Sequence, residues 1–382
     1  MPQPATDPAR APISRRAMLL STLGAAALGG CAVEAEGSLD RYPPFDARAE
    51  PGSTGAAETT WAAARALGPG INYGNMLEAP REGDWGLRVD PAWAAVVADA
   101  GFRHVRLPVR WSNHASLDES AVIDPAFIAR VQTVVDGLLA RGLTVVLNMH
   151  HYRQLDGDAL DAGEARAARS VLRGRFLALW AQIGERFQGY PPQLWFELYN
   201  EPHGDQTPAR WNDLASRALR LLRTGHPARI VVIGPTNWNN PSALATLALP
   251  PDPRLVATFH HYDPMRFTHQ GADWAGDEFR RQGVLCCDAT QRPHILAPLS
   301  VAAEWSKAHN TPVWLGEFGA YGGPPGKPND MASRAAWTRL VRVEADRLGI
   351  PWTYWEFASG FGAYDWAGKR WYKLLREALL GA

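Results

Sequence analysis

The sequence predicts an α/β protein with one (β/α)8 TIM barrel and elaborated loops after its strands, preceded by an export signal and a flexible linker. From Trp61 onward, short apolar runs alternate with longer amphipathic stretches, and eight such alternations favour a closed parallel barrel. The run LTVVLNM at 143–149 is almost entirely apolar, as expected of a parallel strand buried on both faces. No glycine-rich phosphate-binding turn follows the first expected strand, which disfavours the alternative of a doubly wound open sheet.

The expected elements follow one another in a regular order. The first strand begins at Ile71, and the others lie at 102–107, 143–149, 193–199, 230–233, 255–259, 313–315 and 352–355. The helices are expected at 91–100, 125–140, 167–187, 209–223, 297–307, 331–347 and 371–380. We find no internal repeat and no interior linker, so residues 61–382 are expected to form one domain.

Composition narrows the class of protein. A hydrophobic fraction of 46% with 20% charged residues is typical of a globular domain with a large core. The 39 basic and 39 acidic residues cancel, which argues against a nucleic-acid partner because phosphate binding depends on excess positive charge. The 16 tryptophans fit a carbohydrate-binding protein, since indole rings stack on sugars. We expect a monomer.

The N-terminus has the pattern of an export signal, assigned to residues 1–31. Arg15 and Arg16, followed by an apolar run, resemble a twin-arginine signal. The ending Leu28–Cys31 resembles a bacterial lipobox, in which Cys31 would carry a lipid; an ordinary signal peptide that contains a cysteine is the alternative. Residues 32–60 are expected to be a flexible linker. The protein is therefore expected in the periplasm, at the cell surface or outside the cell, with a lipid on Cys31 as its only membrane contact.

Two further cysteines, Cys286 and Cys287, are adjacent in the sequence. Three cysteines give no disulfide framework. We interpret this pair as a loop feature with a structural or incidental role, and its redox state is left open.

Polar and aromatic residues stand where the expected strands end. The active sites of such barrels lie at the C-terminal ends of the strands, so these residues are the candidates for chemistry. They are Arg106, His150, His151, Asn200, Glu201, His260, Tyr262, Glu317 and Trp355.

Two of these residues are carboxylic acids that face each other from the fourth and seventh strands. Glycoside cleavage needs two such groups, ~5–5.5 Å apart for retention of anomeric configuration and ~6.5–9.5 Å apart for inversion. Arg106 and Tyr262 are expected beside Glu317, where the positive charge would keep that carboxylate ionised as a nucleophile. Glu201 must then hold a proton as the acid. Asn200 is expected to bind the substrate's 2-hydroxyl.

Several aromatic and histidine residues have roles that the sequence leaves open. Trp355 is expected to form a stacking floor beneath the sugar. Trp111, Trp238 and Trp274 lie in or near strand-end loops, where they line sugar subsites or fill the core or rim. Either His150 or the adjacent His151 faces the substrate. Two other acids are expected to lie outside the chemistry, namely Glu197, facing away from the site, and Glu356.

The constellation resembles glycoside hydrolase family 5, the cellulase family of retaining β-glycanases. The resemblance spans residues 69–355 and rests on six motifs in order: RLPV, NMHHY, LYNEP, FHHYDP, WLGEFG and YWEF. It implies Glu201 as acid/base and Glu317 as nucleophile, with no metal and no organic cofactor. The segment that begins at Phe259 also resembles bacterial members that act on β-1,4-glucans, so a cellulose-like β-1,4-glucan is the expected substrate.

Three other functions are alternatives to a β-1,4-glucanase. A β-mannanase, xyloglucanase or β-1,3-glucanase would share the same catalytic residues and differ in its loops. A metal-dependent barrel hydrolase usually has a His-x-His pair at the first strand, where this chain has Asn72, Tyr73 and Gly74. A non-catalytic polysaccharide-binding surface lipoprotein would have no use for both Glu201 and Glu317.

Overall fold

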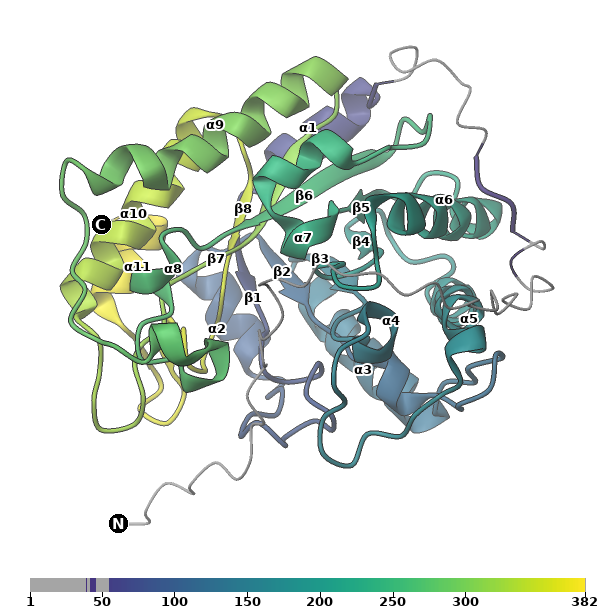
Figure 1. Cartoon of the computed structure of the whole chain (residues 1–382), viewed down its shortest axis with the longest axis horizontal. Helices are drawn as coiled ribbons and strands as arrows, with labels where there is room; N and C mark the ends of the chain where they lie inside the picture. Colours follow the sequence, from purple (N-terminus) through teal and green to yellow (C-terminus); the bar gives the residue numbers. More distant parts are fainter. Residues whose placement is uncertain (1–38, 40–41, 46–54, 382) are drawn as a thin grey trace, which may run out of the picture.

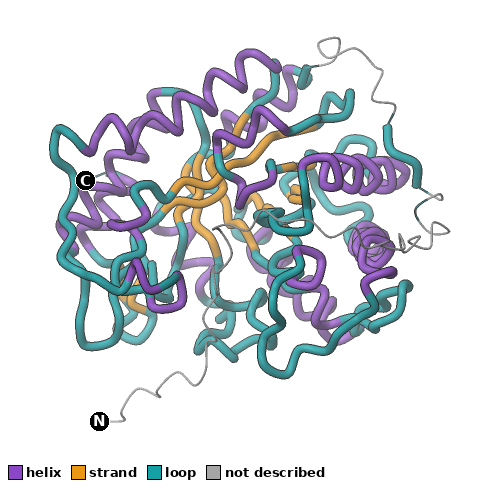
Figure 2. Tube along the Cα trace, in the orientation of Figure 1, coloured by secondary structure: helices purple, strands orange, loops and turns teal. Residues whose placement is uncertain are grey.

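A computed structural model of the chain describes residues 39, 42–45 and 55–381. Its centre is a closed barrel of eight parallel strands in sequence order, with β8 pairing back onto β1. The strands gather at the centre of the described chain (Figures 1 and 2). The strands are β1 Pro69–Asn72, β2 His104–Leu107, β3 Thr144–Asn148, β4 Leu194–Glu197, β5 Val231–Ile233, β6 Leu255–His261, β7 Val313–Phe318 and β8 Trp352–Tyr354. The predicted (β/α)8 barrel is confirmed. The predicted export signal lies outside the described residues.

Helices surround the barrel on the outside (Figure 2). The main ones are α2 Trp93–Ala100, α3 Pro125–Leu139, α5 Leu172–Arg186, α6 Pro208–Gly225, α9 Gln291–His309, α10 Met331–Arg347 and α11 Lys373–Leu380. Short helices lie in the loops after strands, among them α4 Arg153–Asp156, α7 Thr236–Asn239 and α8 Met265–Thr268. In the described residues, no helix is long and apolar enough to cross a membrane.

Local sequence explains where several helices begin. Asp124 caps α3 by accepting a hydrogen bond from the backbone of Ala126, and Pro125 occupies the first turn. Asp330 caps α10 in the same way. Helix α9 begins two turns before its predicted start at 297 and contains Pro298 within it, so this proline does not mark the helix boundary.

Helix α1, Glu58–Ala66, is an element that the sequence did not predict. Ala64 in α1 and Leu67 just after it pack against the lower interior of the barrel, which includes Trp195 and Trp314. The predicted linker boundary at residue 60 is therefore wrong, because the domain already begins at this helix.

Part of the predicted linker also packs on the barrel. The backbone N–H of Phe45 donates to Oγ of Ser216 on α6 at 2.8 Å, and the guanidinium of Arg220 lies 4.6 Å from the Phe45 ring centre. Arg217 donates to the carbonyl of Leu39 at 2.7 Å. These described residues are held against α6, in contrast to the prediction of a free tether over the whole of 32–60.

Two smaller features complete the fold. The strands β9 Tyr364–Asp365 and β10 Arg370–Trp371 form a hairpin before α11, although Trp371 was predicted to begin the last helix. Its indole packs on Phe102 and Phe357 instead. Cys286 and Cys287 are joined by a disulfide in the loop before α9.

Candidate active site

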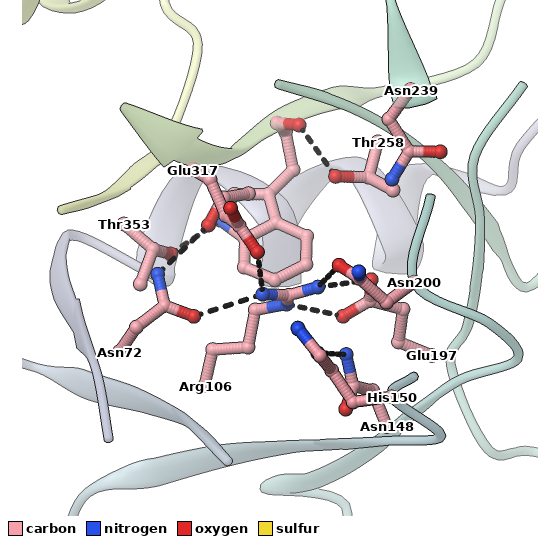
Figure 3. Close-up of polar contacts among 12 residues, drawn as sticks. Asn72, Arg106, Asn148, His150, Glu197, Asn200, Asn239, Thr258, Glu317 and Thr353 are labelled. Atoms are coloured by element: carbon pink, nitrogen blue, oxygen red, sulfur yellow. Dashed lines mark hydrogen bonds and ion pairs between the residues drawn. The ribbon is translucent and has the colours of Figure 1, made fainter. Parts of the chain in front are cut away.

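Arg106, on β2, is the hub of the barrel mouth. Its guanidinium donates two hydrogen bonds to Glu197, at 2.6 and 2.8 Å, and one to Oε1 of Glu317 at 2.6 Å. It also donates to Oδ1 of Asn72 at 3.0 Å and to Oδ1 of Asn200 at 2.8 Å (Figure 3). The Arg106 side chain is fully buried. A buried cation with this set of acceptors is fixed in one orientation and holds the carboxylates around it.

The position of Glu197 corrects the sequence prediction. Trp195 and Glu197 point into the barrel, where Trp195 joins the interior cluster and Glu197 binds Arg106. Phe196 between them packs in the outer core. Glu197 therefore lies beneath the site instead of facing away from it.

Glu317 lies on β7 and is held by two donors. Arg106 contacts Oε1, and the Tyr262 hydroxyl donates to Oε2 at 2.8 Å. His260 Nδ1 lies 3.6 Å from the same Oε2. Burial raises the pKa of Glu317 above its usual value, while His260, Arg106 and Tyr262 act in the opposite direction. The predicted contacts of Arg106 and Tyr262 with this carboxylate are both present.

Glu201 follows β4 in a loop and has a left-handed backbone with φ of 50°. Its carboxylate oxygen Oε1 accepts a hydrogen bond from Nδ1 of His260 at 2.7 Å. Burial lowers the pKa of His260 to about 4, so this ring is neutral, and Nε2 accepts from the Asn239 amide at 3.3 Å. Burial also raises the pKa of Glu201 to about 7. At neutral pH, Glu201 therefore retains a proton in a substantial fraction of molecules.

The two carboxyl groups are close together. One oxygen of Glu201, one of Glu317 and a ring nitrogen of His260 all lie within 4.8 Å of one another. A separation this short suits direct attack by one carboxylate and leaves too little room for an intervening water. Among the residues that the structure describes, these three also form the one group with metal-ligand spacing. The positive charge of Arg106, which contacts Glu317, would repel a metal ion bound by these three residues.

Two rings from the segments just after β8 and β3 stack on each other. Trp355 is half-buried, and its ring stacks on that of His150 at 5.8 Å and 11°. A Cβ on Gly74 would lie 2.9 Å from the Trp355 ring, so only glycine leaves room there. His150 is buried and contacts the Asn148 amide at 3.3 Å, whereas His151 is half-buried beside Trp85.

Most of the chain matches the model of one protein family. The model for cellulases, glycosyl hydrolase family 5, matches residues 72–360, a range that includes Arg106, Glu201, Glu317 and Trp355. The chain belongs to glycosyl hydrolase family 5. This confirms the family resemblance that the sequence motifs indicate.

Named relatives from this family are similar over most of the chain. Endoglucanase H of Acetivibrio thermocellus is 34% identical over 317 residues, which cover 82% of this chain and 32% of that protein. Endoglucanase A of Ruminococcus albus is 28% identical, covering 78% of this chain and 85% of that protein. A structure of endoglucanase Cel5A from the hyperthermophilic Thermotoga maritima is 41% identical with a TM-score of 0.77, covering 84% of this chain and 99% of that one. This chain thus spans about a third of the first relative's length.

The three further tryptophans of this family 5 barrel differ in exposure. Trp111 is completely buried, donates to the Asn148 carbonyl at 2.9 Å and packs on Phe127, so of the two roles left open for it, it fills the core and does not line a sugar subsite. Trp238 is 42% exposed, and Trp274 is half-buried. These two rings remain candidates for contact with a glycan.

Sequence reasoning missed several residues of the site. The sequence predicts no role for Asn72 and predicts that Glu197 faces away from the site, yet both bind Arg106. Asn239 ends the short helix α7, where the left-handed backbone of residues 237–239 follows no hydrophobic period. For His203, the one sequence feature that could have indicated a place in the site is its position two residues after Glu201. Glu356 accepts hydrogen bonds from the backbone of 358, 359 and 361, which keeps it outside the catalytic pair.

Proposed function

We propose that this family 5 enzyme cleaves β-1,4-linked glucan with retention of configuration, using Glu201 as acid/base and Glu317 as nucleophile. The observation that carries the proposal is the pair of carboxylates within 4.8 Å of each other in different environments. Glu317 contacts a cation, Arg106, whereas Glu201 contacts the neutral ring of His260. Charge is therefore favoured at Glu317 and a proton at Glu201.

In the first step, the Glu317 carboxylate attacks the anomeric carbon as Glu201 donates its proton to the glycosidic oxygen. The bond to the leaving chain breaks, and the sugar becomes esterified to Glu317. Trp355 would support the sugar ring from below. Because Arg106 occupies Oδ1 of Asn200, the amide of Asn200 presents its N–H groups to the substrate, where they can donate to the 2-hydroxyl.

In the second step, Glu201 acts as a base. Its carboxylate takes a proton from a water molecule, whose oxygen attacks the anomeric carbon and displaces Glu317. Two inversions at the same carbon give net retention. Glu201 is then protonated and Glu317 ionised again, so the pair returns to its starting state.

The choice of β-1,4-glucan is supported by the relatives, which are endoglucanases. Mannan is the second candidate, because a Thermotoga maritima Cel5A structure that is 40% identical to this chain is described in complex with a mannotriose substrate. Glucose and mannose differ in the orientation of the 2-hydroxyl, the group assigned to Asn200. Comparing kcat/KM on cello- and manno-oligosaccharides of equal length distinguishes the two candidates.

The stereochemical claim is tested by ¹H NMR of the first products formed from a cello-oligosaccharide. We expect the β-anomer to appear first, with the α-anomer growing later by mutarotation. Initial appearance of the α-anomer would contradict the double displacement. Full activity after exhaustive chelation is also expected, since no step involves a metal.

We also propose that the chain is exported, that Cys31 is lipidated and that the enzyme works as a monomer. The twin-arginine-like and lipobox-like motifs support the first two points, and they lie outside the described residues. Mass spectrometry of the mature protein from its native membranes tests lipidation, with Cys31→Ser as the control. A mature N-terminus without lipid in the wild-type protein would contradict the anchor.

A further inference from the structure

His203 stands in the loop between β4 and α6 with both ring nitrogens engaged. Nδ1 lies 2.7 Å from the backbone carbonyl of Glu201, and Nε2 lies 3.1 Å from Oδ2 of Asp158. Carbonyl and carboxylate oxygens only accept hydrogen bonds, so both nitrogens must donate. A neutral imidazole carries one N–H and could satisfy only one of these contacts. The geometry therefore calls for a charged His203.

The charged groups around the ring favour the same state. Asp158 and Asp156 face His203 from the segment after β3, and the backbone N–H of His203 donates to Asp156 at 3.4 Å. Tyr199 donates a hydrogen bond to Asp156, and Arg153 lies 3.9 Å from Asp158. Burial disfavours the cation, but the Asp158 contact and the Asp156 charge outweigh it and raise the pKa of His203 to about 9.

An aromatic ring covers one face of the same imidazole. Trp238 stacks on His203 with ring centres 4.7 Å apart and planes 20° from parallel. An indole face attracts a cation through its electron-rich π-system. His203 is only 15% exposed at its side chain, so these contacts leave it little freedom to turn.

The contact with the Glu201 carbonyl acts on the proposed acid/base directly. Glu201 has a positive φ, a conformation that a residue with a side chain keeps only when its surroundings impose it. His203 fixes the peptide group after Glu201, and His260 fixes the carboxyl end of the same residue. The charge of His203 also lowers the pKa of Glu201, against the rise caused by burial.

We propose that His203 is a positioning residue that, as an imidazolium, ties the backbone of Glu201 to Asp158 and sets the upper pH limit of catalysis. The inference rests on the proposed role of Glu201. With His203 charged, Glu201 gives up its proton at a lower pH than burial alone would allow, so it can act as a base in the second step. Without that charge, Glu201 would remain protonated to a higher pH.

The test compares kcat/KM profiles against pH for the full chain and its His203→Gln variant on a cello-oligosaccharide. We expect the basic limb to move upward by about one pH unit, because a nearby positive charge is lost. We also expect kcat to fall about tenfold or more with little change in KM, and to fall less on an aryl glycoside with a good leaving group. His309→Gln is the matched control, since this ring on α9 also contacts a carbonyl, that of Trp305, away from the site. Its profile should equal that of the wild type.

Asp158→Asn provides a second variant with a smaller change in shape. It removes the partner that holds the charge on His203, so its basic limb should also move upward. Nitrogen-15 NMR of histidine-labelled wild-type protein at pH 7.5 should show both His203 nitrogens protonated, assigned by their loss in His203→Gln. A neutral ring, or an unmoved basic limb with equal losses on both substrates, would overturn the inference. A wild type inactive on every β-glycan would instead overturn the proposed function.

Discussion

Glu317 and Glu201 face each other across one barrel mouth, but they are held by different kinds of structure. Glu317 belongs to β7 itself, paired in register with His260 on β6, and its side chain is 6% exposed. Glu201 lies beyond the end of β4, in a loop with positive φ, and its side chain is 25% exposed. The first is placed by strand register, the second by hydrogen bonds from His260 and His203.

These two settings separate the proposed roles of Glu317 and Glu201. On the strand side, Arg106 contacts the proposed nucleophile, Glu317, directly and is held by Glu197 beneath it. On the loop side, the proposed acid, Glu201, has neutral or indirect partners, and burial raises its pKa to about 7. Changes on the strand side should therefore impair every substrate, whereas changes on the loop side should depend on how much protonation the leaving group needs.

The largest effect is expected at Glu317. Glu317→Gln keeps the shape of the side chain but removes the nucleophile, so kcat/KM should fall by at least about 10⁴-fold on every substrate. Initial rates on a cello-oligosaccharide and on an aryl cellobioside measure this loss, with circular dichroism confirming an intact fold. Activity within tenfold of the wild type would remove Glu317 from the mechanism.

The next effect is expected at Glu201 and should depend on the substrate. Glu201→Ala should lose ~10²–10⁴-fold on cello-oligosaccharides, the usual contribution of general acid catalysis. Aryl glycosides with good leaving groups should lose much less in the first step, because their departure needs little protonation. The ratio of the two losses is the measurement, and equal losses would contradict the acid assignment.

Replacing Arg106 probes the strand side electrostatically. Arg106→Lys keeps a charge but cannot bind Glu197 with two parallel bonds. Because the Arg106 contact lowers the pKa of Glu317, weakening it should raise that pKa and move the acidic limb of kcat/KM to higher pH.

Arg110→Lys is the matched control, as this buried arginine binds Asp161 and Glu164 away from the pair. Both variants should be less stable than the wild type, but only Arg106→Lys should move the limb. A limb that moves equally in both would show a general effect of packing.

The smallest effect concerns stability against pH. Burial raises the pKa of Glu78 and Asp156 to about 7 and the pKa of Glu356 to about 8. The neighbouring aspartates raise the pKa of His203 to about 9. Each folded group holds its proton more tightly than the unfolded chain does, so the folded state loses stability as pH rises through these values. Melting temperature should therefore fall from pH 6.5 to 8.5. Histidines whose pKa is lowered by folding change the stability only below pH 6.5, so they do not offset this trend. A melting temperature that rises from pH 6.5 to 8.5 would contradict these raised pKa values.

The strand-borne half of the site was predictable from the sequence. Polar residues that interrupt apolar runs at strand ends must converge at one end of a parallel barrel, which placed Arg106, Tyr262 and Glu317 together in advance. The contacts among Arg106, Tyr262 and Glu317 could be predicted without knowing the loop conformations. The same reasoning gave the order of the eight strands.

Glu197 on β4 and the loop-borne residues of the site could not be predicted to the same degree. The inward position of Glu197 depends on the phase of strand alternation, and a shift of one residue reverses it. Asn239, at the end of α7, and His203, in the loop after β4, lie at or beside left-handed backbone residues, which no hydrophobic period encodes. Trp111 looked like a loop residue, but its indole turns into the core because the Asn148 carbonyl there accepts its N–H.

Trapping the covalent intermediate on Glu317 tests the double displacement itself. An activated 2-deoxy-2-fluoro cellobioside slows both steps, and a good leaving group lets the first one proceed, so the sugar should accumulate as an ester on the enzyme. Digestion and tandem mass spectrometry should then place one sugar label on Glu317, with the label absent from Glu317→Gln. A label on Glu201 or Glu197, or turnover with no labelled enzyme at any time, would contradict the account.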